Sequence, residues 1–463
     1  IDKSFILSMI RAFNISLYKF MIKIGNLKEE LNNYRINLFD VGENSFCLGI
    51  FFLASALPVA LILILISIVI VILKFKREFF FDKSNIILLT FSIFLVISNY
   101  ESILNFPKDN FDNYPYLNSW ISLFNWIPFL LAFRSFQYYL KNRTQRDKFI
   151  NFLIAGSFPV LLSMFAQYVL NIYGPFSTLN GLIIWFQKPL SFDGDIINKG
   201  VAGLFNNQNY TAYWLSTLFP LLIYNFQIKS KSFIKRFFLF ILIIGFIYFI
   251  ILTDSRSAFL SMAISIAFIA GLKIFFLILV STILIIYSYS LLKFLFAPEI
   301  TIFLDSFFNR NLFWKLSKVS LIDLGNIRRI DLYSKTISLI AEKPLFGWLA
   351  GTFSIMFAFK GGSYYSQHTH NLFLQLAYDY GIIASIILAS IVFKIFFKSF
   401  KKVFFVASSN LNEKAWFIAT FISVFFNLFD MPYYEGKISI LFWTLLAGLN
   451  SIAYEKSTNL KVN

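Results

Sequence analysis

The sequence predicts an all-α integral membrane protein, a polytopic bundle of about 12 transmembrane helices with a long, partly helical external loop. Hydrophobic residues make up 58% of the chain, charged residues make up 14%, and the mean hydropathy is +0.70. A soluble fold of 463 residues could not bury so much apolar surface. The apolar runs are unbroken, whereas barrel strands alternate apolar and polar residues, so a helical bundle is favoured over a β-barrel.

The N-terminal residues 1–44 are expected to form a cytoplasmic or interfacial segment. Its apolar stretch, Phe5 to Ile24, is interrupted by basic residues, which is typical of a helix that lies at the membrane surface. The next run, Phe46 to Leu73, is too long for one simple crossing and contains Pro58. We therefore expect two short spans in a hairpin there.

The remaining spans are expected wherever an apolar run is long enough to cross a bilayer. They are Asn85 to Asn99, Trp120 to Phe136, Phe149 to Ile172, Tyr210 to Phe226, Phe237 to Leu252, Ala258 to Gly271, Ile274 to Leu292, Leu372 to Phe393, Trp416 to Phe429 and Ile438 to Ala453.

The orientation follows from basic clusters in the short connections, because Lys and Arg are enriched on the cytoplasmic side. With these spans the clusters all fall on one side: Lys74, Lys76, Arg77 and Lys83; Lys141, Arg143, Arg146 and Lys148; Lys229, Lys231, Lys235 and Arg236; Lys394, Lys398, Lys401 and Lys402. The intervening connections carry mainly acidic or neutral residues, such as Asp430 and Glu435, and are predicted to be external.

This topology organises the whole chain. Residues 45–292 would hold transmembrane helices 1–9 with the external loop 173–209, and residues 293–371 a long external loop. Residues 372–453 would hold helices 10–12, and 454–463 a cytoplasmic tail. Loops as long as 293–371 are usually functional or disordered, and its aromatic content argues for order.

Several function classes are disfavoured by composition. The net charge of +17 comes from clusters between apolar runs, which encode membrane topology rather than nucleic-acid binding. Cys47 is the sole cysteine, so no internal disulfide and no thiolate metal cluster is expected. The two histidines, His368 and His370, have no further ligand at motif spacing, so the sequence predicts no metal and no other cofactor.

Three stretches that reach the external side could carry chemistry. Arg256 lies in a short turn between two spans, where it could meet an anion or simply snorkel to the interface. Arg328 and Arg329 open a second stretch, and Leu332, Ile337, Leu339 and Ile340 give it an amphipathic pattern, so we expect a helix along the membrane surface. Its arginines could hold a substrate or lipid headgroups.

The third stretch contains both histidines at the point where the long loop re-enters the membrane. Histidine is the side chain best suited to accept a proton near neutral pH. A structural role, with both rings donating to carbonyls at a helix start, is the alternative. Residues two apart point the same way in an extended segment and diverge in a helix, so either both rings or only one would face a site.

Taken together, these motifs resemble the O-antigen ligase and O-antigen polymerase superfamily of bacterial envelope glycosyltransferases. The resemblance covers roughly residues 200 to 385. It rests on Gly203, Phe205, Asn207, Asn209 and Ala212 with Pro220; on Ser255 and Arg256; on Arg329, Tyr333, Pro344, Gly347, Gly351 and Phe353; and on His370, Asn371, Leu374, Asp379 and Gly381. Two positions depart from the family pattern, because Tyr333 stands where Trp is frequent and Leu349 where a glycine is usual.

The resemblance implies a GT-C-like fold in the bacterial inner membrane and a metal-independent transfer on the periplasmic face. A glycan would move from an undecaprenyl diphosphate donor to a sugar hydroxyl, such as that of lipid A-core. Arginines suit a diphosphate leaving group and a neutral imidazole suits a general base. The expected catalytic residues are His370, Arg329 and Arg256, and the expected substrate-binding residues are His368, Asn371, Arg328, Asn207, Asn209 and Tyr333.

Other functions remain open at this point. A polymerase of the same superfamily would differ in using a second lipid-linked repeat unit as acceptor, and a protein-directed glycan transferase is a third possibility. A transporter or flippase should place charged residues at mid-membrane depth. Here the charged candidates lie at the external ends of spans, which argues against transport.

Overall fold

The structure is a computed structural model, and it describes residues 37–106, 116–172, 174, 176–178, 183–185, 200–228, 232–281, 284, 326–362, 366–405 and 410–455. The expected surface helix from Phe5 to Ile24 lies outside these residues. The first half of the described chain forms α2 Leu38–Phe52, α3 Leu57–Phe81, α4 Lys83–Leu104, α5 Leu117–Ser122, η2 Leu123–Asn125, α6 Ile127–Tyr139, α7 Arg143–Gly156, α8 Phe158–Val169, β1 Phe176–Thr178 and β2 Ile183–Trp185.

The second half is also almost wholly helical. It forms α9 Gln208–Ile228, α10 Phe233–Leu252, α11 Arg256–Ser265, η3 Ile266–Ala270, α15 Asn326–Glu342, α16 Phe353–Phe359, α17 Leu372–Tyr380, α18 Ile382–Phe400, η4 Lys401–Phe405, α19 Leu411–Phe429, η5 Pro432–Tyr434 and α20 Gly436–Tyr454. The described strands are β1 and β2, which pair antiparallel with Phe176 opposite Trp185. The predicted all-α class is thus confirmed for the described residues, apart from this short hairpin.

The described residues include 6 helices that are long and apolar enough to cross a membrane. They are Leu57–Phe75, Asn85–Leu104, Arg143–Val169, Phe233–Leu252, Ile382–Phe405 and Gly436–Tyr454. The shorter apolar helices Arg256–Ala270 and Leu272–Ser281 accompany them. A membrane protein is therefore confirmed in general, while the expected number of about 12 spans stays a prediction.

Several expected spans are wrong in detail because the helices break. The run expected from Leu372 to Phe393 is interrupted at Gly381, whose φ of +90° ends α17 and begins α18 in a new direction. The run from Trp120 to Phe136 is divided around Trp126, since Pro128 begins a new helix there.

The expected hairpin near Pro58 is only partly right. The chain does break after α2, and α2 and α3 pack side by side. Pro58 stands in the first turn of α3, where its missing N–H costs nothing. The helix that follows is not short, however, because α3 runs from Leu57 to Phe81 and holds a complete candidate span.

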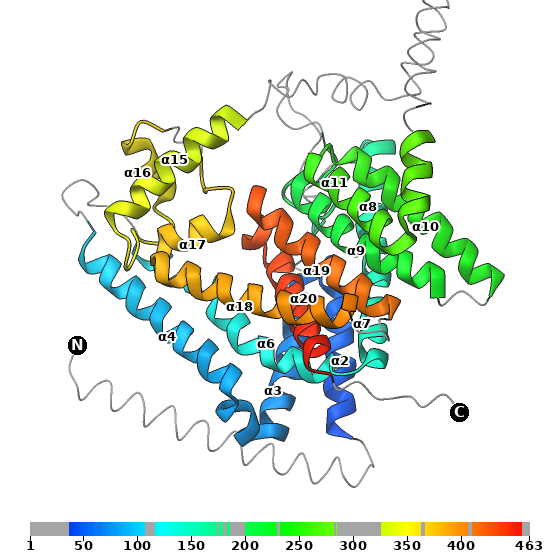
Figure 1. Cartoon of the computed structure of the whole chain (residues 1–463), viewed down its shortest axis with the longest axis horizontal. Helices are drawn as coiled ribbons and strands as arrows, with labels where there is room; N and C mark the ends of the chain where they lie inside the picture. The colour runs from blue at the N-terminus through cyan, green and yellow to red at the C-terminus, as the bar shows by residue number, and fades with distance from the viewer. Residues whose placement is uncertain are drawn as a thin grey trace, which may run out of the picture.

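The largest core lies where α9, α19 and α20 pack together, with α6, α10, α11 and α18 around them (Figure 1). A close approach is made by Gly448 on α20, where an added Cβ would lie 2.2 Å from the ring of Trp416 on α19. The Trp416 indole donates a hydrogen bond to the carbonyl of Leu445 at 2.9 Å. The small Gly448 and the hydrogen-bonded Trp416 indole therefore let α19 and α20 pack closely.

A second, smaller core joins α15 and α16 to α17. Leu332, Leu339 and Ile340 on α15 are buried in it, against Trp348 and Tyr378. The expected amphipathic helix is present, and its place along a membrane surface stays a prediction. Ile330 and Ile337 remain exposed on it, at 65% and 56%.

Two of the basic clusters meet at one end of the bundle. Arg146 is fully buried, with its Nη2 atom 2.7 Å from Glu455 at the end of α20. Lys402, after α18, donates a hydrogen bond to the Glu455 carbonyl. The close pairing of α7, η4 and the end of α20 agrees with the predicted placement of these clusters on one side.

Candidate functional site

The turn that contains both histidines, residues 366–371, is tied to the start of α17 and to the end of α19. Asn371 is the N-cap of α17, and its Oδ1 atom accepts hydrogen bonds from the backbone N–H of Phe373 at 3.0 Å and of Leu374 at 3.1 Å. Its Nδ2 atom donates to the Leu428 carbonyl at 3.1 Å. We call residues 366–371 the histidine turn.

His370 lies at the centre of this turn in a left-handed conformation, with a φ of +54°. Its Nδ1 atom is 3.6 Å from Oδ1 of Asp430, which is longer than a hydrogen bond, so the contact is electrostatic. The His370 side chain is 35% exposed and that of Asp430 only 14% exposed. His370 therefore presents an accessible imidazole against a sheltered carboxylate.

His368 has a different environment although its ring lies only 4.3 Å from that of His370. Its Nδ1 atom accepts a hydrogen bond from the His370 backbone N–H at 3.3 Å, which requires an unprotonated nitrogen. Burial, reinforced by the neighbouring His370 ring and opposed by Asp430, lowers the pKa of His368 to about 4. His368 is thus a neutral structural acceptor, and His370 is the more accessible of the two rings.

Arg329 and Tyr333, one turn apart on α15, approach the same place. The Tyr333 hydroxyl donates to the Leu428 carbonyl at 3.5 Å, and this carbonyl is also the acceptor for Asn371. Burial raises the pKa of Tyr333, Arg329 opposes the shift and Asp430 adds to it. Arg329 and Asp430 therefore act on one hydroxyl, and α15, the histidine turn and α19 converge.

We call this group of residues, Arg329, Tyr333, His370, Asn371 and Asp430, the Asp430 cluster. Asp430 is the member that sequence reasoning missed as a site residue, since it was only assigned to an external turn. It directly follows Phe429, the last residue of α19. The only signal in the sequence was an acidic residue at a membrane boundary, which does not by itself indicate a partner.

The segment before α9 reaches the same acidic residue. The Tyr210 hydroxyl interacts electrostatically with Asp430 and Glu435. Asn207 uses its Oδ1 atom to accept a hydrogen bond from the Asn209 N–H at 2.9 Å. Asn207 therefore organises the first turn of α9, and Tyr210 brings that turn to the Asp430 cluster.

A buried lysine joins this segment to α20. The Nζ atom of Lys437 donates to the Leu204 carbonyl at 2.7 Å, and it lies 4.9 Å from the centre of the Phe205 ring. Glu435 is 3.9 Å away from the same atom. Lys437 is only 6% exposed, so its charge fixes the chain before α9 rather than meeting solvent.

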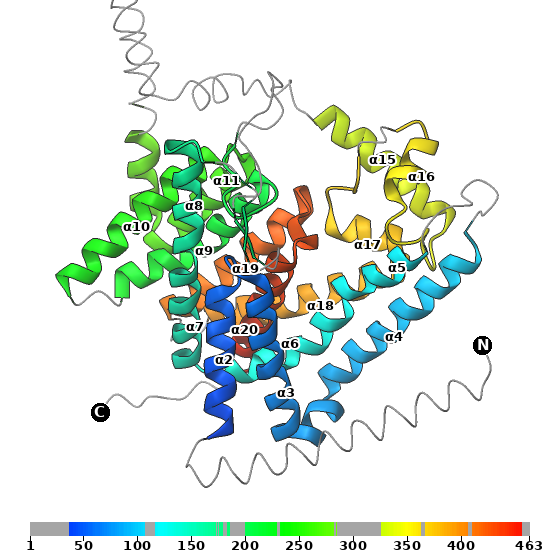
Figure 2. The same ribbon diagram turned by 180° about the vertical axis from the view of Figure 1, so that it is seen from behind.

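Arg256 is the first residue of α11, and its side chain is exposed. The turn before it packs against the chain that enters α9, because the Val201 N–H donates to the Leu252 carbonyl at 3.0 Å and Gly200 lies against Thr253. Figures 1 and 2 show α11 and α15 both in the upper part of the molecule, but on opposite sides of it. No contact among the described residues joins Arg256 to Arg329 or His370.

The remaining predicted residue is Arg328. Its backbone belongs to α15, but its side chain lies outside the described residues. The described residues contain no group of three or more His, Cys, Asp or Glu side chains that could hold a metal ion.

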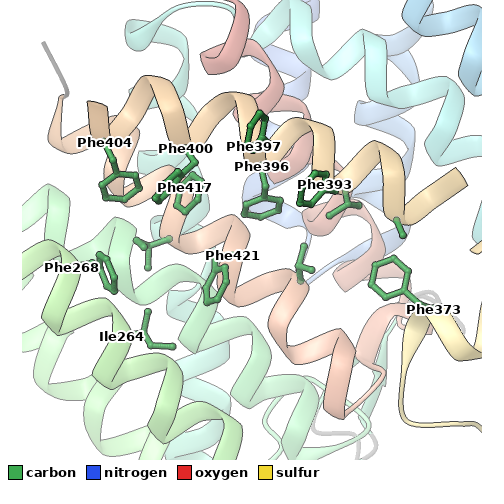
Figure 3. A pocket seen from close by; sticks show the side chains of 14 residues that line it. Ile264, Phe268, Phe373, Phe393, Phe396, Phe397, Phe400, Phe404, Phe417 and Phe421 are labelled. Atoms are coloured by element: carbon green, nitrogen blue, oxygen red, sulfur yellow. The ribbon is translucent and has the colours of Figure 1, made fainter. Parts of the chain in front are cut away.

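An apolar groove of about 780 Å³ lies between α18, α19 and the α11–η3 helix, with Phe373 of α17 in its lining. Figure 3 shows Phe373, from the first turn of α17, at one end and Phe404 and Phe268 at the other. The lining is almost wholly aromatic and aliphatic: Ile264, Phe268, Phe373, Ala389, Val392, Phe393, Phe396, Phe397, Phe400, Phe404, Phe417, Ile418, Phe421 and Val424. Such a lining suits a hydrocarbon chain.

Backbone hydrogen bonds tie the loop after α15 to the end of α17 and the start of α18. The Ile382 N–H donates to the Pro344 carbonyl at 2.8 Å, and the Trp348 N–H donates to the Tyr378 carbonyl at 2.8 Å. Leu349, which replaces the usual glycine of the resembling family, has a φ of +133° and is fully buried. The loop therefore keeps a glycine-type conformation with leucine in place.

Comparison with known proteins gives one family. Residues 238–389 match the family model described as O-antigen ligase. The matched range takes in α10, α11, α15, α16 and α17, and it contains Arg256, Arg329 and His370. No curated protein matches the chain significantly. The match supports the O-antigen ligase and polymerase superfamily and a glycosyltransferase activity of that general kind.

Proposed function

We propose that the chain is an O-antigen ligase-like glycosyltransferase that moves a glycan from a polyprenyl diphosphate donor to a sugar hydroxyl. The observation that carries the proposal is that Asp430 lies 3.6 Å from His370 Nδ1 and acts, together with Arg329, on the Tyr333 hydroxyl of α15. A cation for a leaving group and a base for a hydroxyl are the two groups that this transfer needs. The match over residues 238–389 supports the reaction class.

The proposed reaction is a single displacement. His370 takes the proton of the acceptor hydroxyl, the hydroxyl oxygen forms a bond to the anomeric carbon, and the bond from that carbon to the diphosphate oxygen breaks. The electron pair leaves with the diphosphate, whose growing negative charge Arg329 stabilises through charge-assisted hydrogen bonds. The proton passes from His370 to solvent or to the released diphosphate. Every step uses side chains alone and needs no metal.

Asp430 has an orienting role in this proposal. A carboxylate beside Nδ1 favours the tautomer with the proton on Nδ1, which leaves the lone pair of Nε2 free to accept a proton. The distance of 3.6 Å would shorten to a hydrogen bond when the acceptor orders the ring. Tyr333 and Asn371 hold the two flanking segments through the shared Leu428 carbonyl.

Arg256 is assigned to the far side of the diphosphate. It is exposed in the upper part of the molecule, across from α15, and a bound diphosphate is the group through which it would act together with Arg329. Asn207, Asn209, Asn371 and Arg328 are assigned to the glycan, whereas His368 supports the histidine turn. The apolar groove that begins at Phe373 would take the polyprenyl chain.

The cellular setting is part of the same proposal. About 12 spans in a GT-C-like bundle would place the Asp430 cluster on the periplasmic face of the bacterial inner membrane. Lipid A-core or another envelope glycan would be the acceptor. A polymerase would use the same cluster with a second lipid-linked unit, and the length distribution of the products separates the two activities.

Transfer by the purified protein tests the proposal. Lipid-linked oligosaccharide is supplied in detergent with a glycan acceptor, and His370→Ala and Arg329→Ala are compared with the wild type. Each substitution should lower transfer at least about 100-fold without unfolding the protein, since each removes a group required in the transition state. Full transfer by either folded variant would show that the assignment is wrong.

A further inference from the structure

A chain of buried hydrogen bonds lies behind the histidine turn. Gln375 and Asp379 stand one turn apart on α17, and the Gln375 Nε2 atom donates to Asp379 Oδ1 at 3.0 Å. The other carboxyl oxygen, Oδ2, accepts a hydrogen bond from the Tyr434 hydroxyl at 3.0 Å. Gln375 is 4% exposed and Asp379 is 3% exposed, so neither reaches a substrate.

The carbonyl end of the Gln375 amide binds the backbone of the histidine turn. Its Oε1 atom accepts a hydrogen bond from the backbone N–H of Thr369 at 3.0 Å. The Thr369 hydroxyl in turn donates to the Asn371 carbonyl at 2.7 Å. His370 lies between these two residues, so the backbone on each side of the imidazole is held while its φ stays at +54°.

The direction of each bond matters because a glutamine amide has one donor end and one acceptor end. A carboxyl group offers only an acceptor to Gln375, and this turns the acceptor end, Oε1, toward the Thr369 N–H. A reversed amide would point its donor end at another donor. The position of the histidine turn therefore depends on the polarity of a residue that never meets the substrate.

We propose that the hydrogen bonds from Gln375 to Asp379 and from Thr369 to Gln375, which we call the polarity lock, position the His370 imidazole for proton transfer. The proposal rests on the proposed function, in which His370 is the general base. Asp379 and Gln375 are positioning residues, because they act on His370 through Thr369. Tyr434 holds the far side of the lock from η5, which directly follows the loop that carries Asp430.

The lock works in either protonation state of Asp379. The helix α17 lies outside the candidate spans, and burial raises the pKa of Asp379 to about 7, with hydrogen bonds from Tyr434 and Gln375 opposing the shift. A proton on Oδ2 leaves Oδ1 free to accept from Gln375. The lock is therefore a fixed support in the wild type rather than a pH switch.

Four variants test the lock. Gln375→Leu and Asp379→Leu break it, whereas Asp379→Asn preserves it, because the asparagine oxygen can accept from Gln375 while its amino group donates to the Tyr434 oxygen. Gln137→Leu is the matched control, since Gln137 is also buried and accepts a side-chain hydrogen bond, here from Arg134 on the same helix, remote from the histidine turn.

Two readouts are measured on the purified full chain. The first is kcat for transfer from a lipid-linked oligosaccharide. The second is the rate of diethyl pyrocarbonate modification of the peptide that carries His368 and His370, the only histidines in the chain. Breaking the lock should lower kcat about 100-fold with little change in KM and should speed the modification of the partly buried His368. Asp379→Asn and Gln137→Leu should resemble the wild type in both.

A fifth variant, Gln375→Glu, tests the polarity of this residue directly. It places a second carboxyl group against Asp379, among Tyr434, Tyr380 and Tyr433. Two carboxyl groups at this distance can share one proton, but they repel each other once both are ionised. Its kcat relative to the wild type should therefore fall as pH rises. This test also decides the matter if Gln375→Leu does not fold.

The outcomes separate the two proposals. Wild-type kcat and wild-type histidine reactivity in folded Gln375→Leu, or a pH-independent ratio in Gln375→Glu, would overturn the lock. Activity in His370→Ala together with faster histidine modification in Gln375→Leu would instead overturn the proposed function and leave the lock as the device that fixes the turn.

Discussion

At the scale of single residues, the two histidines differ because their surroundings differ. His368 is partly buried and accepts a hydrogen bond from the His370 backbone, whereas the partly exposed ring of His370 faces Asp430. The sequence favoured His370 through family likeness alone, because two histidines of one motif have the same chemistry until burial is known. The spacing indicated proximity but could not assign the roles.

His368 should make stability depend on pH. Its pKa is 6.5 in an unfolded chain and about 4 in the fold, so the folded state binds fewer protons between these values. Stability is fully present above pH 6.5 and is lost as pH falls toward 4, by about 3 kcal/mol at most. His368→Asn keeps an acceptor without titrating, so its unfolding temperature in detergent should fall less than that of the wild type over this window. An equal fall would contradict the assignment.

Asp430 should contribute to turnover rather than to donor binding. Asp430→Asn removes the charge beside His370 Nδ1, and we expect kcat to fall about 10- to 100-fold with KM for the donor nearly unchanged. Asp331→Asn is the control, since Asp331 lies on α15 but is 55% exposed and pairs with Lys335 at 3.0 Å. Steady-state kinetics of both variants decide the point: a comparable loss in Asp331→Asn would indicate a general charge effect.

At the scale of elements, the sequence predicted where helices exist better than where they break. The hydrophobic runs predicted the bounds of α9, α10, α19 and α20 to within a few residues, because the lipid phase and the protein core both favour continuous apolar sequence. The break at Gly381 was not predicted, since one glycine inside an apolar run is compatible with a continuous helix. It is imposed by tertiary packing, where the Leu345 carbonyl approaches the glycine.

That packing can be tested with two glycines that share a positive φ. Gly381 has a φ of +90° and an added Cβ would collide with the Leu345 carbonyl, whereas Gly271 has a φ of +103° and open space around it. Both alanine variants carry a similar backbone strain, of about 1–3 kcal/mol, because ψ is 163° at Gly381 and 153° at Gly271. Gly381→Ala should be destabilised by at least about 2 kcal/mol more than Gly271→Ala, because backbone must move. Thermal unfolding in detergent measures the difference, and equal destabilisation would exclude the close approach as its cause.

At the scale of the whole molecule, the site is assembled from segments far apart in the sequence. Tyr210, Tyr333, His370 and Asp430 come from different elements and share one electrostatic neighbourhood. The motifs predicted that these stretches face the same side of a membrane, which follows from topology alone. Their contact depends on how α15 and α17 pack on the end of α19, and no local pattern encodes such packing.

The proposed role of the apolar groove in holding the polyprenyl chain can be separated from catalysis. Ala389 lines the groove, whereas Ile386 on the same helix is 57% exposed and lies outside it. Ala389→Trp should therefore fill part of the groove and raise KM for a long-chain polyprenyl donor about tenfold, with kcat little changed, because a uniform binding contribution is lost. Ile386→Trp should match the wild type.

Donors with a short prenyl chain should not distinguish Ala389→Trp from the wild type, since they do not extend past Phe373 along the groove. An unchanged KM in Ala389→Trp, or an equal rise in Ile386→Trp, would mean that the chain of the donor lies elsewhere.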